Sequence, residues 1–145
     1  MPAPALLDTS VYISALRQGP STALAARNWT AGRALWLSAV VLEELYAGAK
    51  PKDRDVIARL ERGFGRAGRI LVPTLGDWVE TGLVLAQVGS MYGFEQIGRG
   101  RLTNDALIAL SAARFGCTVV TTNRRDFALL AEFRPLRYEV VAELR

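Results

Sequence analysis

Residues 103–127 place a helical pattern, a glycine, a short apolar run and a polar turn in succession, which constrains the possible fold more than any other stretch. Thr103 or Asn104 is a suitable N-cap for the apolar residues that follow at helical spacing, and Gly116 is a natural helix stop. Residues 117–120 are apolar, partly β-branched and too few for a second helix, so they predict a buried strand. This helix-then-strand unit is typical of α/β layer folds.

An acid lies at each end of this unit: Asp105 near the start of the expected helix and Asp126 just after the expected strand. In open α/β sheets, helix starts and the carboxyl ends of parallel strands border the same crevice, where ligands bind. We therefore expect Asp105 and Asp126 to meet. Thr121 and Asn123, in the polar turn between them, are able to hydrogen-bond a ligand or a neighbouring carboxylate, although such residues are also common turn formers.

The same alternation of short apolar runs and helical patterns extends along the whole chain. Strands are expected at residues 5–7, 34–37, 70–72, 117–120 and 138–141. The intervening segments have helical spacing, notably residues 75–92. We predict a three-layer α/β/α sandwich around a mainly parallel central sheet, formed by residues 1–145 as a single domain.

Composition removes several classes of chemistry. The chain has no histidine and one cysteine, which excludes histidine-based catalytic pairs, zinc sites built on histidine or cysteine, and a disulfide framework. Any catalysis must rely on carboxylates, with a cation that prefers oxygen ligands. No apolar run is long enough to span a bilayer, and the first residues lack the basic region of a signal peptide, so we expect a soluble cytoplasmic protein without membrane association.

The net charge is +4, and nearly all basic residues are arginines, which suit phosphate recognition. Arg99 and Arg101, close to Asp105, are the candidates for contacts with substrate phosphates. Residues 59–69 contain four arginines and three glycines. They are compatible either with a mobile basic segment that contacts a polyanion or with a solvated helix end.

Two further acids are candidates for the same site. Asp8 directly follows the first expected strand, although Asp8, Thr9 or Ser10 is also suited to cap the next helix. Glu44 lies beside the apolar face of the helix that begins after Ser38, whereas the Glu43 side chain points about a quarter-turn away, toward solvent. Because an acid beside a buried face costs stability unless it has partners, Glu44 is the better functional candidate.

Asp8, Glu44, Asp105 and Asp126 are thus expected to converge on one rim of the sheet. Carboxylates crowded together repel one another unless a divalent cation neutralises them, and an all-oxygen set of ligands suits Mg²⁺ or Mn²⁺. Such an ion activates water and stabilises charge on a phosphodiester under attack.

Four segments carry a more specific signal: LLDTSVYISAL with Asp8, SAVVLEELYAGA with Glu44, DALIALSA with Asp105, and TTNRRDF with Thr121, Asn123 and Asp126. In this order and spacing the chain resembles the PIN-domain ribonucleases, and most closely the VapC-type toxins of toxin–antitoxin pairs. The resemblance covers nearly the whole chain. One departure is Val41, where many relatives have threonine. No motif matches between residues 54 and 100, so the choice of substrate stays open.

This resemblance implies a divalent-metal-dependent endoribonuclease that cleaves cellular RNA, is neutralised by a cognate antitoxin and forms a homodimer. It implies that Asp8, Glu44 and Asp105 bind the principal Mg²⁺ or Mn²⁺, and that Asp126 completes the cluster and assists a second ion or the attacking water. Thr121 and Asn123 would orient the carboxylates.

Three alternatives stay open at the level of sequence. In a phosphatase, Asp8 would be the nucleophile, but that class usually has a second aspartate at the position of Ser10. A PIN-like module would dock RNA or a protein without catalysis, and an RNA-processing nuclease would act without an antitoxin. A phosphoenzyme trapped on Asp8 would favour the phosphatase. Failure to bind Mn²⁺ would favour the docking module, and the absence of a neighbouring antitoxin gene would favour the RNA-processing nuclease.

Overall fold

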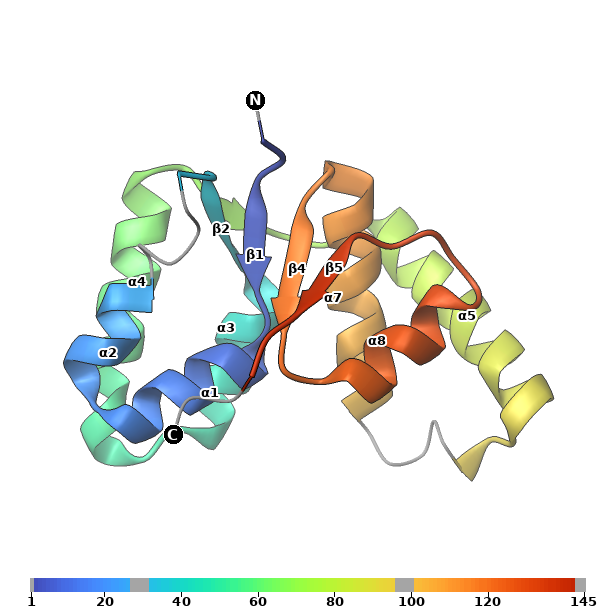
Figure 1. The fold of residues 1–145 in the computed structure, drawn as a ribbon, viewed down its shortest axis with the longest axis horizontal. Coiled ribbons are helices and arrows are strands. Elements are labelled where there is room, and N and C mark those ends of the chain that lie inside the picture. The colour runs from blue at the N-terminus through green and yellow to red at the C-terminus, as the bar shows by residue number, and fades with distance from the viewer. Residues whose placement is uncertain (1, 27–31, 96–100, 143–145) are drawn as a thin grey trace.

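The computed structural model describes residues 2–26, 32–95 and 101–142, with only the backbone of Arg101. Short strands alternate with helices along the chain (Figure 1). The strands are β1 (Ala5–Leu7), β2 (Leu35–Ser38), β3 (Ile70–Leu71), β4 (Thr118–Thr121) and β5 (Tyr138–Val140). The helices are α1 (Thr9–Gln18), α2 (Pro20–Ala25), α3 (Ala39–Gly48), the 3₁₀ turn η2 (Pro51–Asp53), α4 (Arg54–Arg66), α5 (Leu75–Tyr92), α7 (Arg101–Phe115) and α8 (Arg124–Ala131).

The five strands form a parallel sheet in the order β3-β2-β1-β4-β5. Helices α1 to α4 lie on one side of the sheet and α5, α7 and α8 on the other, which confirms the predicted three-layer α/β/α fold (Figure 1). β1 and β4 are neighbours at the centre, with Leu7 opposite Val120. Their carboxyl ends therefore lie side by side, although they are more than a hundred residues apart in the sequence.

Apolar side chains of the strands build the core between the helical layers. Leu6, Leu37 and Val119 are almost completely buried, as expected for parallel strands covered on both faces. Phe127 of α8 is also fully buried and its ring packs near that of Tyr138. In the ranges that the structure describes, no helix is both long enough and apolar enough to cross a membrane.

One predicted helix start is wrong. The segment predicted to begin at Thr103 or Asn104 begins at Arg101, which places Asp105 in the second turn of α7 rather than the first. Leu102 explains the difference, because its side chain is buried in the core. The helix therefore already includes Leu102 and begins about one turn earlier than predicted. At α1, Asp8 occupies the N-cap position, but its carboxylate makes no capping hydrogen bond, and the hydroxyls of Thr9 and Ser10 do not cap the helix either.

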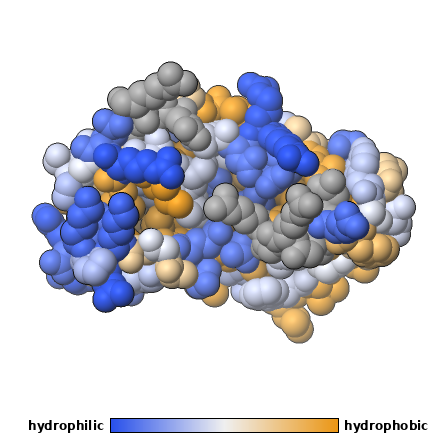
Figure 2. All heavy atoms as spheres, turned by 90° about the horizontal axis from the view of Figure 1, so that it is seen from below, coloured by the Kyte–Doolittle hydropathy of each residue, from blue (hydrophilic) through white to orange (hydrophobic). Residues whose placement is uncertain are grey.

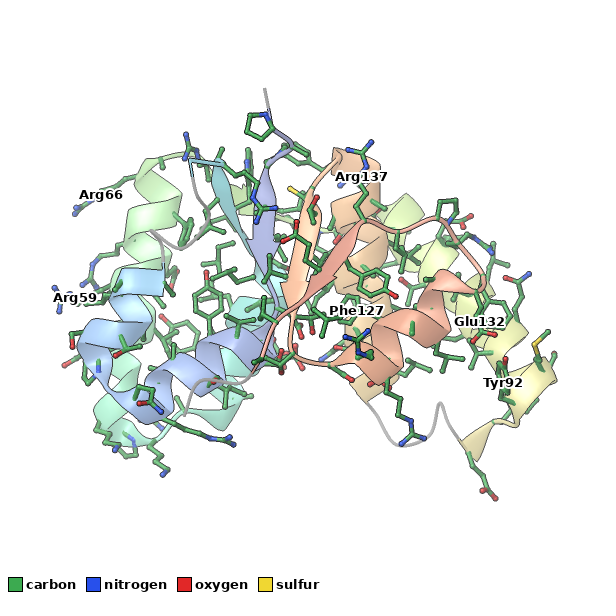
Figure 3. All side chains as sticks on the ribbon, viewed as in Figure 1. Arg59, Arg66, Tyr92, Phe127, Glu132 and Arg137 are labelled. Atoms are coloured by element: carbon green, nitrogen blue, oxygen red, sulfur yellow. The ribbon has the colours of Figure 1, made fainter. Side chains whose placement is uncertain are left out.

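The basic segment at residues 59–69 is mostly helical, since α4 continues to Arg66. Arg59 and Arg66 point outward from the layer formed by α1 to α4, away from the carboxyl ends of the strands (Figure 3). The solvated helix end is therefore the interpretation that fits these two arginines.

Candidate active site

The neighbouring ends of β1 and β4 hold Asp8. Its backbone N–H donates to the carbonyl oxygen of Val120 at 2.8 Å, which continues the strand pairing by one residue. Two hydroxyls then donate to the same carboxylate oxygen, Oδ2: that of Thr121 at 2.9 Å and that of Ser10 at 2.9 Å. The other oxygen, Oδ1, is buried without a hydrogen-bond partner among the described residues. The strand ends thus fix the carboxylate and leave one oxygen available.

Helix α3 brings Glu44 to the same place. Ser38 ends β2 and caps α3 by accepting a hydrogen bond from the N–H of Val40 at 3.1 Å. One turn further along, Glu44 Oε1 accepts a hydrogen bond of 2.7 Å from the Thr9 hydroxyl. Glu44 is partly buried and Glu43 is exposed, as the helical spacing predicts. Adjacent residues Thr9 and Ser10 therefore each hold a different acid.

Asn123 joins the other two acids. Its side-chain amide donates to Asp105 Oδ2 at 3.2 Å and to Asp126 Oδ2 at 2.9 Å. Its side-chain oxygen accepts from the N–H of Asp126 at 3.3 Å, which makes Asn123 the N-cap of α8. Its own N–H donates to Thr121 Oγ1 at 2.9 Å. One turn of chain after β4 thus connects Asp105, Asp126 and the hydroxyl that holds Asp8.

We call Asp8, Glu44, Asp105 and Asp126 the acid cluster, and their electrostatics show that they act on one another. Burial raises the pKa of Asp105 to about 9, together with the charge of Asp8, a hydrogen bond with Asp126, and the charges of Asp126 and Glu44. Burial also raises the pKa of Asp8, against the lowering effect of its hydrogen bonds from Thr121 and Ser10. Side-chain oxygens gather at the lower ends of the strands in Figure 3.

A divalent cation fits the chemistry of this cluster. Each of the four acids has one oxygen engaged by a protein donor, and the buried Oδ1 of Asp8 has none. Crowded carboxylates with a raised pKa are those that a cation would stabilise most, and oxygen ligands suit Mg²⁺ or Mn²⁺. Within the described ranges, no group of three such side chains is already arranged to hold a metal ion.

Sequence reasoning missed the roles of Thr9 and Ser10. The signal was available, because two hydroxyl residues directly follow the acid at the end of a strand. We interpreted them as helix caps, since a hydroxyl at a helix start usually caps it. Ser10 also accepts a hydrogen bond of 3.1 Å from the N–H of Thr122. Where the phosphatase alternative would place a second aspartate, this serine donates to Asp8 instead.

The two arginines proposed to contact substrate phosphates are not tested by the structure. Arg99 lies outside the described residues. The backbone of Arg101 begins α7, and its side chain also lies outside what the structure describes.

The family model of the PIN domain matches residues 5–132, which include all four segments of the acid cluster. The chain belongs to the PIN domain family. This confirms the resemblance found in the sequence, and the parallel sheet with its strand-end acids is the PIN domain of this chain. No curated protein matches the chain significantly.

Solved structures similar to this PIN domain include chains of toxin–antitoxin complexes. A chain of the DNA-bound VapBC from Salmonella typhimurium is 25% identical with a TM-score of 0.63, and the match covers 96% of this chain and 98% of that one. A chain of VapBC2 from Rickettsia felis, bound to a promoter DNA fragment, is 22% identical with a TM-score of 0.62, over 94% and 98% of the two chains. A chain of FitAcB from Neisseria gonorrhoeae is 26% identical with a TM-score of 0.57, over 92% and 95%.

Proposed function

We propose that this PIN domain is a VapC-type toxin, an endoribonuclease that depends on Mg²⁺ or Mn²⁺, cleaves cellular RNA in the cytoplasm and is neutralised by a cognate antitoxin. The observation that carries the proposal is the acid cluster, four carboxylates gathered at the strand ends, each with one oxygen held by a protein donor. Family membership and the similarity to chains of VapBC complexes support it.

In this proposal Asp8, Glu44 and Asp105 hold the principal cation. The cation would supply a water of lowered pKa and neutralise the charge that develops on the phosphodiester. Asp126 completes the cluster and accepts the proton of the attacking water or holds a second ion. Because this chemistry needs only oxygen ligands, it is open to a chain without histidine.

The neighbouring polar residues keep the acids in position. Thr121 and Ser10 fix Oδ2 of Asp8, so Oδ1 is the oxygen that would face the cation. Thr9 fixes Glu44, and Asn123 fixes Asp105 and Asp126 through one amide group. Such donors orient ligands and commonly change metal affinity or activity by 10- to 100-fold when removed.

The matched pair Glu44→Gln and Glu43→Gln tests the proposal. The two residues are neighbours on α3, but only Glu44 belongs to the acid cluster. Purified variants are incubated with tRNA and ribosomal RNA in Mg²⁺, Mn²⁺ or chelator. We expect cation-dependent cleavage at discrete sites by the native protein and by Glu43→Gln, and none by Glu44→Gln or Asp8→Asn. Cleavage that persists in chelator, or in both acid-cluster variants, would refute the assignment.

Cation binding distinguishes the proposed nuclease from a non-catalytic docking module. Titration with Mn²⁺, followed by its paramagnetic signal or by calorimetry, should show binding by the native chain that Asp8→Asn weakens at least tenfold. A folded native chain that binds no Mn²⁺ and cleaves no RNA would favour the docking module.

We also propose that the protein is a homodimer formed through α5. This helix exposes an apolar face that includes Leu75, Trp78, Val79 and Leu83, each at least 51% exposed. Hydrophobic surface is visible at the α5 end of the molecule in Figure 2. Contiguous exposed apolar surface marks an interaction site. Sedimentation equilibrium should give a dimer for the native chain and a folded monomer for Leu83→Arg, and a monomeric native chain would refute the dimer.

The neighbouring genes and co-purification test whether a cognate antitoxin exists. A small gene beside this one should encode a DNA-binding protein that co-purifies with the chain and suppresses its cleavage of RNA. If no such partner exists and the chain still cleaves RNA, the RNA-processing nuclease is the better description.

A further inference from the structure

A pocket of about 340 Å³ lies beside the acid cluster, between α1, α3 and the segment that follows α3. Leu16, Leu45 and Ala49 contribute its apolar wall, and Leu45 is almost completely buried. Glu44 lines the same pocket. The pocket and the acid cluster therefore share a side chain, and a ligand in the pocket lies next to the atoms proposed to act on the phosphodiester.

Three cations border this pocket: Arg17, Lys50 and Lys52. All three are exposed, and none forms an ion pair with another residue in the described part of the chain. The two lysines are the only ones in the sequence. Asp53 and Glu44 are the acids of the lining, so the border keeps an excess of positive charge. Unpaired cations gathered around an apolar hollow complement a ligand that has an apolar body and negative charges on either side.

We propose that this pocket receives the nucleobase next to the cleaved phosphodiester of single-stranded RNA, with Arg17, Lys50 and Lys52 on the flanking phosphates. The proposal rests on the proposed ribonuclease function and specifies how its substrate is held. Proteins that recognise single-stranded RNA place unstacked bases against apolar or planar side chains and track the backbone with cations. On the α1–α4 half of Figure 2, hydrophobic surface is bordered by strongly hydrophilic residues, as such a site needs.

A peptide segment is the other possible occupant. RNA is favoured for two reasons: the cations are unpaired, which suits a polyanion, and Glu44 makes the pocket continuous with the acid cluster. A base in the pocket would then hold its own phosphate close to that cluster. The pocket would thus contribute to the choice of cleavage site as well as to affinity.

Gly48 allows the pocket to be filled without disturbing the fold. It lines the pocket at the end of α3, and a Cβ built there meets no atom within 4 Å. Gly48→Phe therefore adds a ring at the lining of the pocket without a clash at Cβ. Gly65→Phe is the matched control: Gly65 is an exposed helical residue of α4, and a Cβ there meets only Ile70 Cδ1 at 3.7 Å. Circular dichroism and thermal melting check that both variants fold.

The experiment combines these variants with an abasic scan of the substrate. An RNA oligonucleotide that spans a mapped cleavage site is prepared with a single base removed at each position near the scissile bond. For native protein and Gly65→Phe, we expect one abasic position to lower kcat/KM by about tenfold or more, the lower range of what a bound base contributes. Gly48→Phe should cleave the intact RNA at about that lower level and show no further loss with the abasic RNA.

Three outcomes would overturn the proposal. In the first, the abasic scan is flat for a native protein that cleaves RNA. In the second, the loss at the sensitive position is as large in Gly48→Phe as in the native protein. In the third, Gly48→Phe cleaves like the native protein but escapes its antitoxin, which would assign the pocket to a peptide. If the native protein cleaves no RNA, the proposed function fails first and this inference fails with it.

The cations provide a second, independent test that does not depend on Gly48→Phe. The double variant Lys50→Gln/Lys52→Gln should reduce the salt dependence of RNA binding. The slope of the logarithm of the binding constant against the logarithm of the salt concentration should become shallower by about 1.4, because each lost phosphate contact with a single strand contributes about 0.7. The control Arg59→Gln/Arg66→Gln removes the same charge from a face that points away from the strand ends and should leave the slope unchanged (Figure 3). Equal slopes in the two double variants would refute the phosphate contacts.

Discussion

Replacing Asp105 by asparagine should stabilise the cation-free protein while it abolishes cleavage. The pKa of Asp105 is raised from 3.8 to about 9, mainly by burial and by the charge of Asp8. At pH 7 the native state therefore holds a proton on Asp105 that the unfolded state has released. Asparagine mimics the protonated acid, since its oxygen accepts from Asn123 and its amide replaces the proton shared with Asp126.

The size of the effect follows from linkage. A group that binds its proton more tightly in the native state favours folding at low pH, and that advantage is lost as the pH rises from about 4 to about 9. The pH of 7 lies about three pH units above the ordinary pKa of the acid, and each unit costs about 1.4 kcal/mol of the free energy of unfolding. The loss of stability at pH 7 therefore has an upper limit near 4 kcal/mol. With relaxation of the site we expect about 2 to 4 kcal/mol, or an increase in Tm of roughly 5 to 15 °C.

Urea unfolding of the native protein and of Asp105→Asn, from pH 5 to pH 9 in chelator, measures this difference. The native protein should lose stability across this range more steeply than the variant. Mn²⁺ should stabilise the native protein and narrow the gap, because a bound cation replaces the proton. Asp55→Asn, at an exposed position of α4, is the control and should shift stability by no more than about 0.5 kcal/mol. Equal stability of the native protein and Asp105→Asn at pH 7, or parallel pH profiles, would refute the reasoning.

Three further predictions follow from other contacts. Thr9→Val removes only the hydroxyl that donates to Glu44, so it should weaken Mn²⁺ binding by about tenfold without a comparable change in stability to urea. Thr9→Ser keeps the hydroxyl and should bind Mn²⁺ like the native protein. Unchanged Mn²⁺ affinity in Thr9→Val would contradict this role. Asp77→Ala should cost about 2 to 4 kcal/mol in urea unfolding, since buried Asp77 closes a capping box and pairs with Arg114 at 2.9 Å, and a loss below about 1 kcal/mol would refute that role. Cys117, 1% exposed and with its pKa raised to about 11 by burial, should react with a thiol reagent only after unfolding, and rapid labelling of the native protein would exclude this burial.

The central part of the fold was predictable because it depends on local patterns. Short apolar runs bounded by polar turns located all five strands to within one residue at each end, and the bounds predicted for α5 agree with Leu75–Tyr92. Parallel pairing then places strand ends along one edge, so the meeting of the acids followed from topology. The position of Glu44 beside the buried face of α3 was equally readable from the helical repeat.

The missed features depend on partners distant in the sequence. A hydroxyl at a helix start has two uses, and the sequence alone does not distinguish them: Thr9 bonds an acid 35 residues away, and Ser10 lies near Thr121, 111 residues away. The start of α7 was misplaced for a similar reason, because burial of Leu102 in the core outweighs the capping preference of the residues after it. Tertiary contacts decided each case.

Asn123 bears on when such an enzyme becomes active during its synthesis. The amide that joins Asp105 to Asp126 is made more than a hundred residues after Asp8, the first member of the acid cluster. It also depends on β4, which must pair with β1, a strand translated more than a hundred residues earlier. A nascent chain that stops before Asn123 therefore lacks an assembled acid cluster. The proposed ribonuclease activity would arise only after Asn123 has been made and β4 has paired with β1, at the stage when an antitoxin is able to meet a folded partner.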